Sequence, residues 1–381
     1  MKDEEDPGFG SCAFHGTGRC RLCKDRGAGG NRCFRSSEHH SRDRSGREYA
    51  GGCSGRNHNG GSNGGGSSAS IPDGSAGGDS EKGLTADERA GEFITVGTGP
   101  TSGIYFPIGG AFATALADWG YKTSAESTNA TGQNIQNMLN GDLEIAIAMQ
   151  DAVMQAYTGT EAYDGIEPAE NLRALMRLWP NYVQLVTTAD TGITSIQDLV
   201  GKRVGVGAAN SGVEINARMI LNAYGITYDD ITPDYLAYGE AIENMKNGQC
   251  DAVFVTSGLP NATVMDLGVQ YDMVVVPLDG EGRDKLVEEY PYYAKSVIPA
   301  NTYNNTEDIE GIFVYNIMLV RDDLSNEMVY DMLEGIFANI DTIKNSHNTA
   351  NENIDITFGV DDIQLPLHPG AEEFWKDNGY L

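Results

Sequence analysis

Hydrophobic and polar positions divide the chain into two parts that meet near residue 90. Residues 1–90 are dominated by Gly, Ser, Arg and Asp and show no periodic apolar pattern. From residue 93 onward, short apolar runs typical of buried strands alternate with stretches whose apolar residues recur every three or four positions. The pattern therefore predicts a disordered leader and Gly/Ser-rich tether over 1–90, followed by a folded α/β body.

The body is predicted to alternate strands with helices, which builds a parallel or mixed sheet covered on both faces. The expected strands are 92–99, 121–128, 143–150, 172–179, 182–188, 203–207, 233–238, 251–258, 271–278 and 311–320. The expected helices are 107–119, 131–140, 212–224, 239–247, 283–290 and a long one from Ser325 toward Asp341. Pro107 is expected at the first position of its helix.

The pattern restarts halfway along the body. The segments TVGTGPTSG (95–103) and RVGVGAANSGVE (203–214) each join a strand to a helix through a polar, glycine-rich loop. We therefore predict two α/β lobes with a ligand cleft between them, faced by strand ends and helix N-termini. The expected boundaries are 91–186 plus 312–381 for lobe 1 and 187–311 for lobe 2, with the hinge where 181–188 and 311–320 cross between them.

Charge is distributed as unevenly as hydrophobicity. Residues 1–90 carry 13 of the 26 basic and 13 of the 55 acidic residues, so the formal net charge of −29 belongs to the body. Such a charge repels nucleic acid and anionic membranes, so we expect no nucleic-acid partner. An acidic surface with few lysines suits a halophilic protein working in high salt, where self-repulsion is screened; an ordinary acidic protein is the alternative.

Five of the six cysteines lie in the first 90 residues, and Cys250 is expected to pack as a small hydrophobe at the start of a strand. Cys20 and Cys23 have the spacing of zinc ligands, but the second pair of a firm zinc motif is missing, so no metal is predicted. The segment AGGCSGRNHNGGSNGGGSS (50–68) is typical of a lipidation site at Cys53 followed by a tether. The apolar segment required upstream is absent, which leaves a misread leader over 1–48 as a hypothesis.

Three loops of the body place hydroxyl and amide groups before a helix, where free N–H groups and the helix dipole favour an anion. They are Thr101-Ser102-Gly103, Ser127-Thr128-Asn129 with Thr131 and Gln133, and Asn210-Ser211-Gly212-Val213. Ser211 and Glu214 are expected to form a capping box. Each hydroxyl could instead only cap its own helix; three such loops in one cleft favour ligand binding.

The spacing Gly97-x-Gly99-x-x-x-Gly103 is one residue longer than a dinucleotide fingerprint, with Glu126 in the place of the ribose-binding acid. The helix also starts too late for that motif, so we predict no cofactor. Catalytic patterns are likewise weak: the body has two histidines, and His368 is expected to cap or pack the C-terminal helix. We therefore predict a binding protein and not an enzyme.

The body resembles the TAXI-type solute receptors of tripartite (TRAP) secondary transporters. The resemblance runs in order through 94–116, 126–159, 193–221, 248–267, 290–303 and 365–380, and the block ITSIQDLVGKRVGVGAANSGVEINARMIL (193–221) is its most specific part. It implies a periplasmic-binding-protein fold of type II, with a mixed sheet flanked by helices in each lobe, that closes over a small carboxylate or amino acid such as glutamate or 2-oxoglutarate. The implied ligand residues are Thr98, Thr101, Ser102, Tyr105, Ser127, Thr128, Asn129, Gln150, Asn210, Ser211, Gly212, Ser257 and Gly258.

The resemblance further implies a monomeric receptor outside the cytoplasmic membrane that delivers its solute to the membrane subunits of a TRAP transporter. Asn129 stands where the family often has Gly, which leaves the ligand open. A receptor of an ABC-type uptake system is the alternative on the same fold. An NAD-dependent α/β enzyme and a cytoplasmic ligand-sensing regulator are further alternatives.

Overall fold

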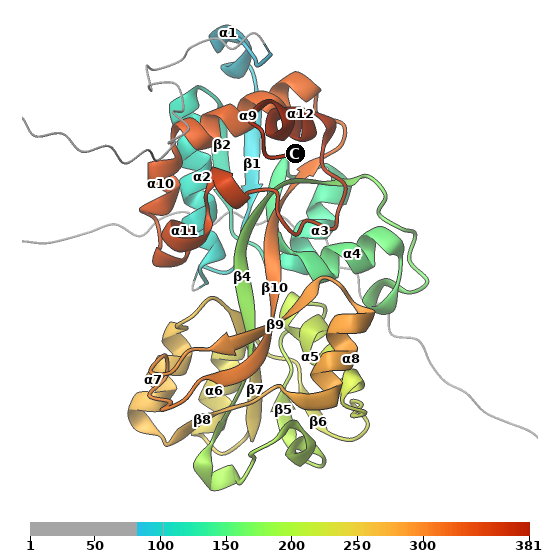
Figure 1. Cartoon of the computed structure of the whole chain (residues 1–381), viewed down its shortest axis with the longest axis vertical. Coiled ribbons are helices and arrows are strands. Elements are labelled where there is room, and N and C mark those ends of the chain that lie inside the picture. Colours follow the sequence, from blue (N-terminus) through green and yellow to red (C-terminus); the bar gives the residue numbers. More distant parts are fainter. Residues whose placement is uncertain (1–81, 102) are drawn as a thin grey trace, which may run out of the picture. The chain divides into compact units, whose positions relative to one another are not determined.

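The computed structural model describes residues 82–101 and 103–381, which form two lobes joined by two long strands (Figure 1). These strands, β4 (Leu172–Thr188) and β10 (Ile309–Arg321), pair antiparallel and run through both lobes. The sheet order is β2-β1-β3-β10-β4-β7-β5-β6, with β8 beside β4 and β9 beside β10. The two-lobed, mixed α/β fold expected from the sequence is confirmed.

The first lobe is built on parallel pairing of β1 (Phe93–Gly97) with β2 (Lys122–Glu126) and β3 (Ile145–Met149). Its helices are α1 (Ala86–Arg89), α2 (Tyr105–Trp119), α3 (Thr131–Asn140), α4 (Gln150–Thr158), α9 (Asn326–Ala338), α10 (Ile340–Lys344), α11 (Asn348–Asn353) and α12 (Pro369–Asp377). Ile145 and Ile147 pack with apolar residues of α2 and α9, whereas Ala146 and Ala148 pack with α3 and α4. The alternation along β3 therefore gives each face of the sheet its own helical layer.

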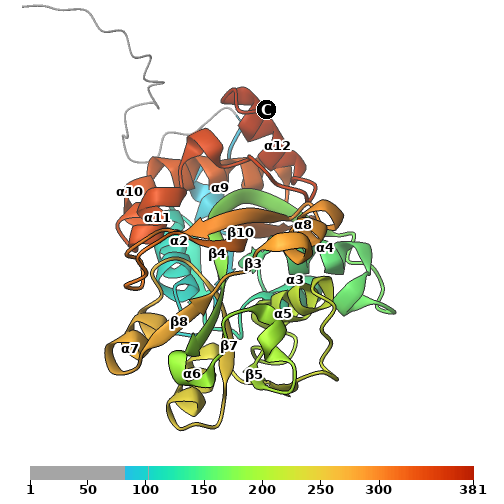
Figure 2. The same ribbon diagram turned by 60° about the horizontal axis from the view of Figure 1, so that its bottom comes forward.

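The second lobe follows the same plan. Its strands are β5 (Arg203–Gly205), β6 (Thr232–Asp234), β7 (Ala252–Ser257), β8 (Met273–Val276) and β9 (Tyr293–Ile298), and its helices are α5 (Gly212–Ala223), α6 (Tyr238–Lys246), α7 (Ala262–Gln270) and α8 (Gly280–Glu289). Phe254 of β7 packs toward α5 and α8, while Val253 and Val255 pack toward α6 and α7. Figure 2 shows α5 and α6 on opposite sides of β7.

Short 3-10 helices complete the two lobes: η1 (Glu161–Tyr163), η2 (Ala189–Thr191), η3 (Ile196–Leu199) and η4 (Ile356–Phe358). Cys250 is buried immediately before β7, as expected. No helix in the described part of the chain is long and apolar enough to span a membrane.

Several predicted elements need correction. The two strands expected at 172–179 and 182–188 form one continuous strand, β4, because Pro180 lies at a shift in the pairing with β10, where its missing N–H is tolerated. The first long helix begins at Tyr105, so Pro107 is its third residue. The apolar pattern did not predict α4, α7, α11 or β9.

Residues 82–90, expected to belong to the disordered leader, pack on the first lobe instead. Thr85 and Glu88 form a reciprocal capping box around α1. Arg89, which is 1% exposed, donates from Nε to both carboxylate oxygens of Asp331 at 3.0 Å. The predictions for residues 1–81, including acylation of Cys53 and the zinc alternative at Cys20 and Cys23, lie outside the described residues.

The Arg89–Asp331 pair generates a stability prediction. Asp331 is fully buried and also accepts hydrogen bonds from Tyr121 Oη at 2.6 Å and Trp119 Nε1 at 3.2 Å. Arg89→Met removes its cation and leaves the charge buried, which we expect to lower the free energy of unfolding by about 3–5 kcal/mol in urea titrations. Arg203→Met breaks the solvent-exposed pair with Asp251 and should cost about 1 kcal/mol or less. Equal losses for the two variants would contradict this account.

Candidate functional site

A cavity of about 420 Å³ lies between the lobes, within the size range of small-molecule sites. The first lobe and β4 contribute Pro100, Gly103, Ile104, Tyr105, Asn129, Ala130, Met149 and Asn181. The second lobe contributes Gly207, Ala208, Ser211, Gly212, Val213, Ala237, Tyr238, Gly239, Glu240, Thr256, Ser257 and Thr263. Both lobes therefore supply the wall, and the cavity exists only while they are together.

The N-terminal turns of several helices end at this cavity. Ile104 and Tyr105 belong to the start of α2, Ser211 and Gly212 to the start of α5, and Tyr238 to the start of α6. The first N–H groups of a helix have no acceptor within the helix and carry the positive end of its dipole. The arrangement therefore provides convergent donors for an anionic group. Glu240 is the one charged residue among the described residues of the wall.

Hydroxyl groups behind the wall brace the loops that lead to α2 and α3. The Thr128 hydroxyl lies 3.0 Å from the carbonyl oxygen of Thr98 and 2.7 Å from Asn134 Oδ1. Asn134 Nδ2 donates to the same Thr98 carbonyl at 2.7 Å, and Ser127 Oγ donates to the Gly99 carbonyl at 3.0 Å. These contacts fix the two loops against each other and so position the two helix starts.

Buried amides join the first lobe to β4 and β10 at the cavity. Asn181 Nδ2 donates to Tyr105 Oη at 3.2 Å and to Asn316 Oδ1 at 3.1 Å, and Asn181 Oδ1 accepts from Trp179 Nε1 at 3.1 Å. Tyr105 Oη in turn donates to Asn316 Oδ1. Burial raises the pKa of Tyr105, so its hydroxyl remains a neutral hydrogen-bonding group.

The end of β7 carries two hydroxyl groups, of which one has hydrogen-bond partners and the other has none. Ser257 Oγ accepts from Gln184 Nε2 at 3.0 Å and Asn261 Nδ2 at 3.1 Å, and donates to the Gly258 carbonyl at 3.1 Å. Thr256 is 5% exposed, lines the cavity, and its Oγ1 has no protein partner within the described part of the chain. A buried unpaired hydroxyl is costly, so Thr256 is a candidate for direct contact with a ligand.

Backbone strain also occurs at the wall. Ala130, immediately before α3, has φ 64° and ψ −144°, a region that residues with a Cβ seldom occupy. Such a conformation costs about 1–3 kcal/mol and persists where surrounding contacts enforce it. Its position at the cavity supports a functional role for this loop, which contains Asn129, one of the predicted ligand residues.

The lobes touch closely around the cavity, so the described conformation is a closed one. A methyl group added to Gly132 of α3 would collide with the backbone carbonyl of Asn210 from the second lobe. Likewise, a methyl group at Gly258 would lie 3.1 Å from Thr349 Oγ1 of α11. Glycine at these positions allows the approach of the two lobes.

The structure divides the predicted ligand residues into groups. Tyr105, Asn129, Ser211, Gly212 and Ser257 line the cavity. Thr98, Ser127 and Thr128 brace the loops behind it, and Thr101 and Asn210 are exposed on the adjoining loops. Gly258 is buried against α11, and Ser102 lies outside the described residues.

Gln150 lies away from the cavity wall and holds the C-terminal segment. Its Nε2 donates to the Asp362 carbonyl at 3.0 Å, and its Oε1 accepts from the Gln364 N–H at 2.9 Å. Tyr238, Glu240 and Thr256 also line the cavity and were not among the predicted ligand residues. No pattern in the sequence indicated Thr256, because the alternation of β7 is expected to send adjacent residues such as Thr256 and the predicted Ser257 to opposite faces of the strand.

Two local predictions can be compared with the geometry. Ser211 caps α5 by accepting from the Glu214 N–H at 3.3 Å, but the reciprocal half of the capping box is wrong. The Glu214 carboxylate instead accepts from Tyr228 Oη at 3.0 Å and pairs with Arg218. His368 caps α12 by accepting from the Gly370 N–H at 3.1 Å, as predicted.

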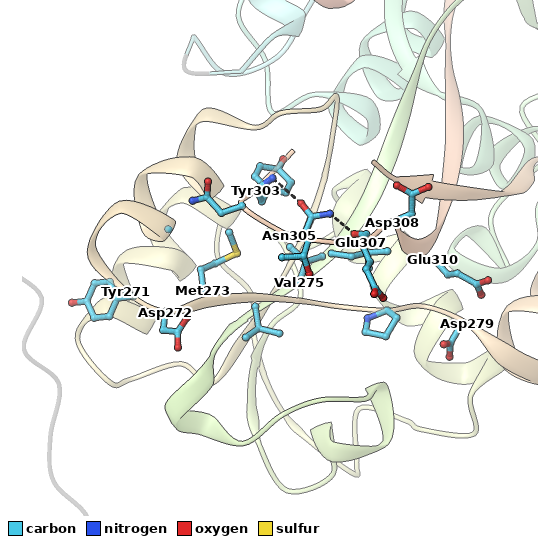
Figure 3. Close-up of a pocket in the computed structure, with 16 residues that line it drawn as sticks. Tyr271, Asp272, Met273, Val275, Asp279, Tyr303, Asn305, Glu307, Asp308 and Glu310 are labelled. Atoms are coloured by element: carbon cyan, nitrogen blue, oxygen red, sulfur yellow. Dashed lines mark hydrogen bonds between the residues drawn. The ribbon is translucent and has the colours of Figure 1, made fainter. Parts of the chain in front are cut away.

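A second cavity, of about 530 Å³, lies on the second lobe beside β8 and the loop that contains Asn305 (Figure 3). Its charged wall residues are all acidic: Asp272, Asp279, Glu307, Asp308 and Glu310. Asn305 holds the loop by donating to the Glu307 carbonyl at 2.7 Å and accepting from the Tyr303 N–H at 3.0 Å. Of these two cavities of the described residues, the first is the one at which helix N-termini from both lobes meet, so that cavity is the candidate functional site.

Comparison with known proteins identifies the family. A model of the NMT1-like family matches residues 96–379, which include both lobes and every described residue of the cavity wall. The chain belongs to the NMT1-like family. This assignment is coarser than the resemblance to TAXI-type receptors, which stays a prediction.

Solved structures of low sequence identity are similar to this NMT1-like protein. The periplasmic aliphatic sulphonate binding protein SsuA from Escherichia coli is 14% identical, with 75% of this chain and 83% of that chain covered and a TM-score of 0.43. PhnD1 from Prochlorococcus marinus, solved with methylphosphonate, is 11% identical, with 76% and 99% covered and a TM-score of 0.48. An ABC uptake transporter substrate binding protein from Streptococcus pneumoniae with bound histidine is 14% identical, with 68% and 93% covered and a TM-score of 0.42.

The close approach at Gly132 predicts a variant that opens the NMT1-like protein without unfolding it. In Gly132→Ala the new methyl group collides with the Asn210 carbonyl only when the lobes are closed, whereas Ala is favoured over Gly inside a helix. We expect a larger radius of gyration in small-angle X-ray scattering and an unchanged or higher melting temperature.

The matched control is Gly110→Ala in α2, where an added methyl group has no neighbour within 4 Å. This variant should keep the scattering profile of the wild type. A compact Gly132→Ala protein with an unaltered profile would contradict the closed contact.

Proposed function

We propose that this NMT1-like protein is an extracytoplasmic solute-binding receptor that captures a small anionic solute between its lobes and passes it to a membrane transporter. The observation that carries the proposal is the convergence of helix N-termini from both lobes on one cavity. An anion there is bound by groups of both lobes, so its binding favours the closed conformation over the open one.

The chemistry of the wall favours a carboxylate or amino acid. Free N–H groups at Gly212 and Val213 suit a carboxylate, and the unpaired Thr256 hydroxyl can donate a further hydrogen bond. Glu240, at the start of α6, offers a counter-charge for an ammonium group. Glutamate or another amino acid satisfies both features, and 2-oxoglutarate satisfies the first.

Two kinds of membrane partner are proposed. The sequence blocks that resemble TAXI-type receptors favour the membrane subunits of a TRAP transporter. The second candidate is an ABC-type uptake system, the role for which the Streptococcus pneumoniae protein is named. Copurification of the full chain with each kind of permease expressed from the same genome separates the two.

A screen of ligands by thermal shift tests the binding function. The full chain is heated in high salt with glutamate, 2-oxoglutarate, other amino acids, alkylsulphonates, phosphonates and NAD. A solute at a hundred times its dissociation constant should stabilise the protein by about 2.7 kcal/mol. Stabilisation by a carboxylate or amino acid supports the proposal, while stabilisation by NAD alone contradicts it and favours an enzyme.

Thr256 provides a residue-level test. Thr256→Val keeps the shape of the side chain and removes the hydroxyl, so we expect the affinity for the stabilising solute to fall about tenfold, one hydrogen bond's contribution. Titration calorimetry measures the change. Thr114→Val, an exposed position in α2, is the matched control and should bind like the wild type. Equal affinities in all three proteins would exclude Thr256 from the ligand contact.

A further inference from the structure

A buried carboxylate lies at the meeting of the two lobes, outside the wall of the ligand cavity. Asp151, at the start of α4 in the first lobe, is fully buried. Its Oδ2 accepts from Tyr293 Oη of β9 at 3.0 Å and from Asn216 Nδ2 of α5. Helices α4 and α5 belong to different lobes and lie side by side (Figure 1). Asp151 therefore makes its side-chain hydrogen bonds across the lobe boundary.

The donors and acceptors of this cluster do not balance when Asp151 is ionised. Asn216 Nδ2 donates to Asp151 and also lies 3.1 Å from Tyr293 Oη, so both of its N–H groups have partners. Asp151 Oδ1 and Asn216 Oδ1, however, are both buried without a partner among the described residues. Two acceptors thus lack a donor, since the side-chain N–H and O–H groups of Asn216 and Tyr293 are already used and the backbone N–H groups of Asp151 and Ala152, which also act on the Asp151 carboxyl, leave both oxygens unpaired.

One proton corrects the imbalance. A protonated carboxyl is a donor and an acceptor at once, and a primary amide has the complementary pair. A proton on Asp151 Oδ1 can be donated to Asn216 Oδ1, while Asn216 Nδ2 continues to donate to Asp151 Oδ2. We propose that Asp151 and Asn216 form an acid–amide latch across the cleft, so that closing of the lobes takes up one proton from solvent onto Asp151.

Burial is consistent with this assignment. It raises the pKa of Asp151 from an ordinary 3.8 to about 6, against the lowering effect of hydrogen bonds from the Ala152 backbone N–H, Tyr293, the Asp151 backbone N–H and Asn216. In the open form the carboxyl meets water and regains its ordinary pKa. The closed form is therefore favoured at low pH, by up to about a hundredfold, and this advantage is lost as pH rises through about 6.

Neighbouring ionisable groups do not supply a competing charge. Tyr105, Tyr163, Tyr292 and Tyr293 surround the carboxyl, and burial raises the pKa of each, so they stay neutral across this range. The charged residues on elements packed against α4 have other partners: Glu161 with Tyr290, Glu214 with Arg218, Glu310 with Arg283, Lys295 with Asp284, and Arg321 with Asp323. Strand β3 and helix α3 carry no charged residue.

The latch rests on the proposed function only in that both require the lobes to close, and its test uses no ligand. The full chain, labelled with ¹³C at the aspartate carboxyl carbons, is titrated by NMR from about pH 2.5 to pH 8. We expect one aspartate to titrate near pH 6 in the wild type and to be missing from Asp151→Asn. In Gly132→Ala, whose lobes are held apart, the same carboxyl should titrate about two pH units lower.

The controls make each outcome decisive. Asp142→Asn changes an exposed aspartate of the same lobe and should keep the titration near pH 6. Asp151→Asn supplies an amide N–H where the proton would lie, so its scattering profile should be equally compact at pH 5 and pH 8. If a water bridges Asp151 Oδ1 and Asn216 Oδ1 instead, Asp151 of the wild type should titrate near its ordinary pKa of 3.8, and this result would overturn the latch. A titration near pH 6 that persists unchanged in Gly132→Ala also overturns it, because the shift would then not depend on closing. Failure of every solute to bind would count against the proposed function and leave this titration unaffected.

Discussion

The antiparallel pairing of β4 with β10 is the constraint on which the rest of the structure depends. In the first lobe β10 pairs with β3 and β4, and in the second lobe β4 pairs with β7 and β8 while β10 pairs with β9. Each lobe thus shares its sheet with the other through the same two strands. The shift in register near Pro180 and Tyr315 interrupts the ladder where the strands pass between the lobes. A bend there would move one lobe relative to the other while the layers of each lobe stay packed, which is the hinge that the sequence predicts.

A binding site made by closing has a particular electrostatic advantage in this chain. The net charge of −29 disfavours an anion at long range, but the first N–H groups of α2, α5 and α6 act only over short distances at the cavity. Salt screens the surface charge and leaves such buried dipoles largely unaffected. Bringing the two lobes together also removes Asp151 from water. The two proposals, ligand capture and protonation at the lobe boundary, therefore depend on the same closing movement.

Much of the fold was predictable because its determinants are local. The strand predicted at 143–150 contains the apolar run 145–149, which forms β3. The helix predicted at 131–140 agrees with α3 at both ends, and Gly141 ends it in the left-handed conformation. The prediction of two strands instead of β4 was wrong because the effect of Pro180 depends on its partner strand. Among the residues that line the cavity, Ser211 and Gly212 were predicted from loop chemistry and Tyr105 from the resemblance to TAXI-type receptors. Thr256 and the Asp151–Asn216 pair were missed because their importance lies in unmatched hydrogen bonds between segments far apart in sequence.

The most direct test of the account is a crystal structure of the full chain with the carboxylate or amino acid that stabilises it most. We predict the solute in the cavity between the lobes, with a carboxylate oxygen accepting from the N–H groups of Gly212 and Val213 and with Thr256 Oγ1 within hydrogen-bond distance. A solute bound instead in the acidic cavity beside β8, or bound to lobes that remain apart, would contradict the central claim that closing of the cleft creates the binding site.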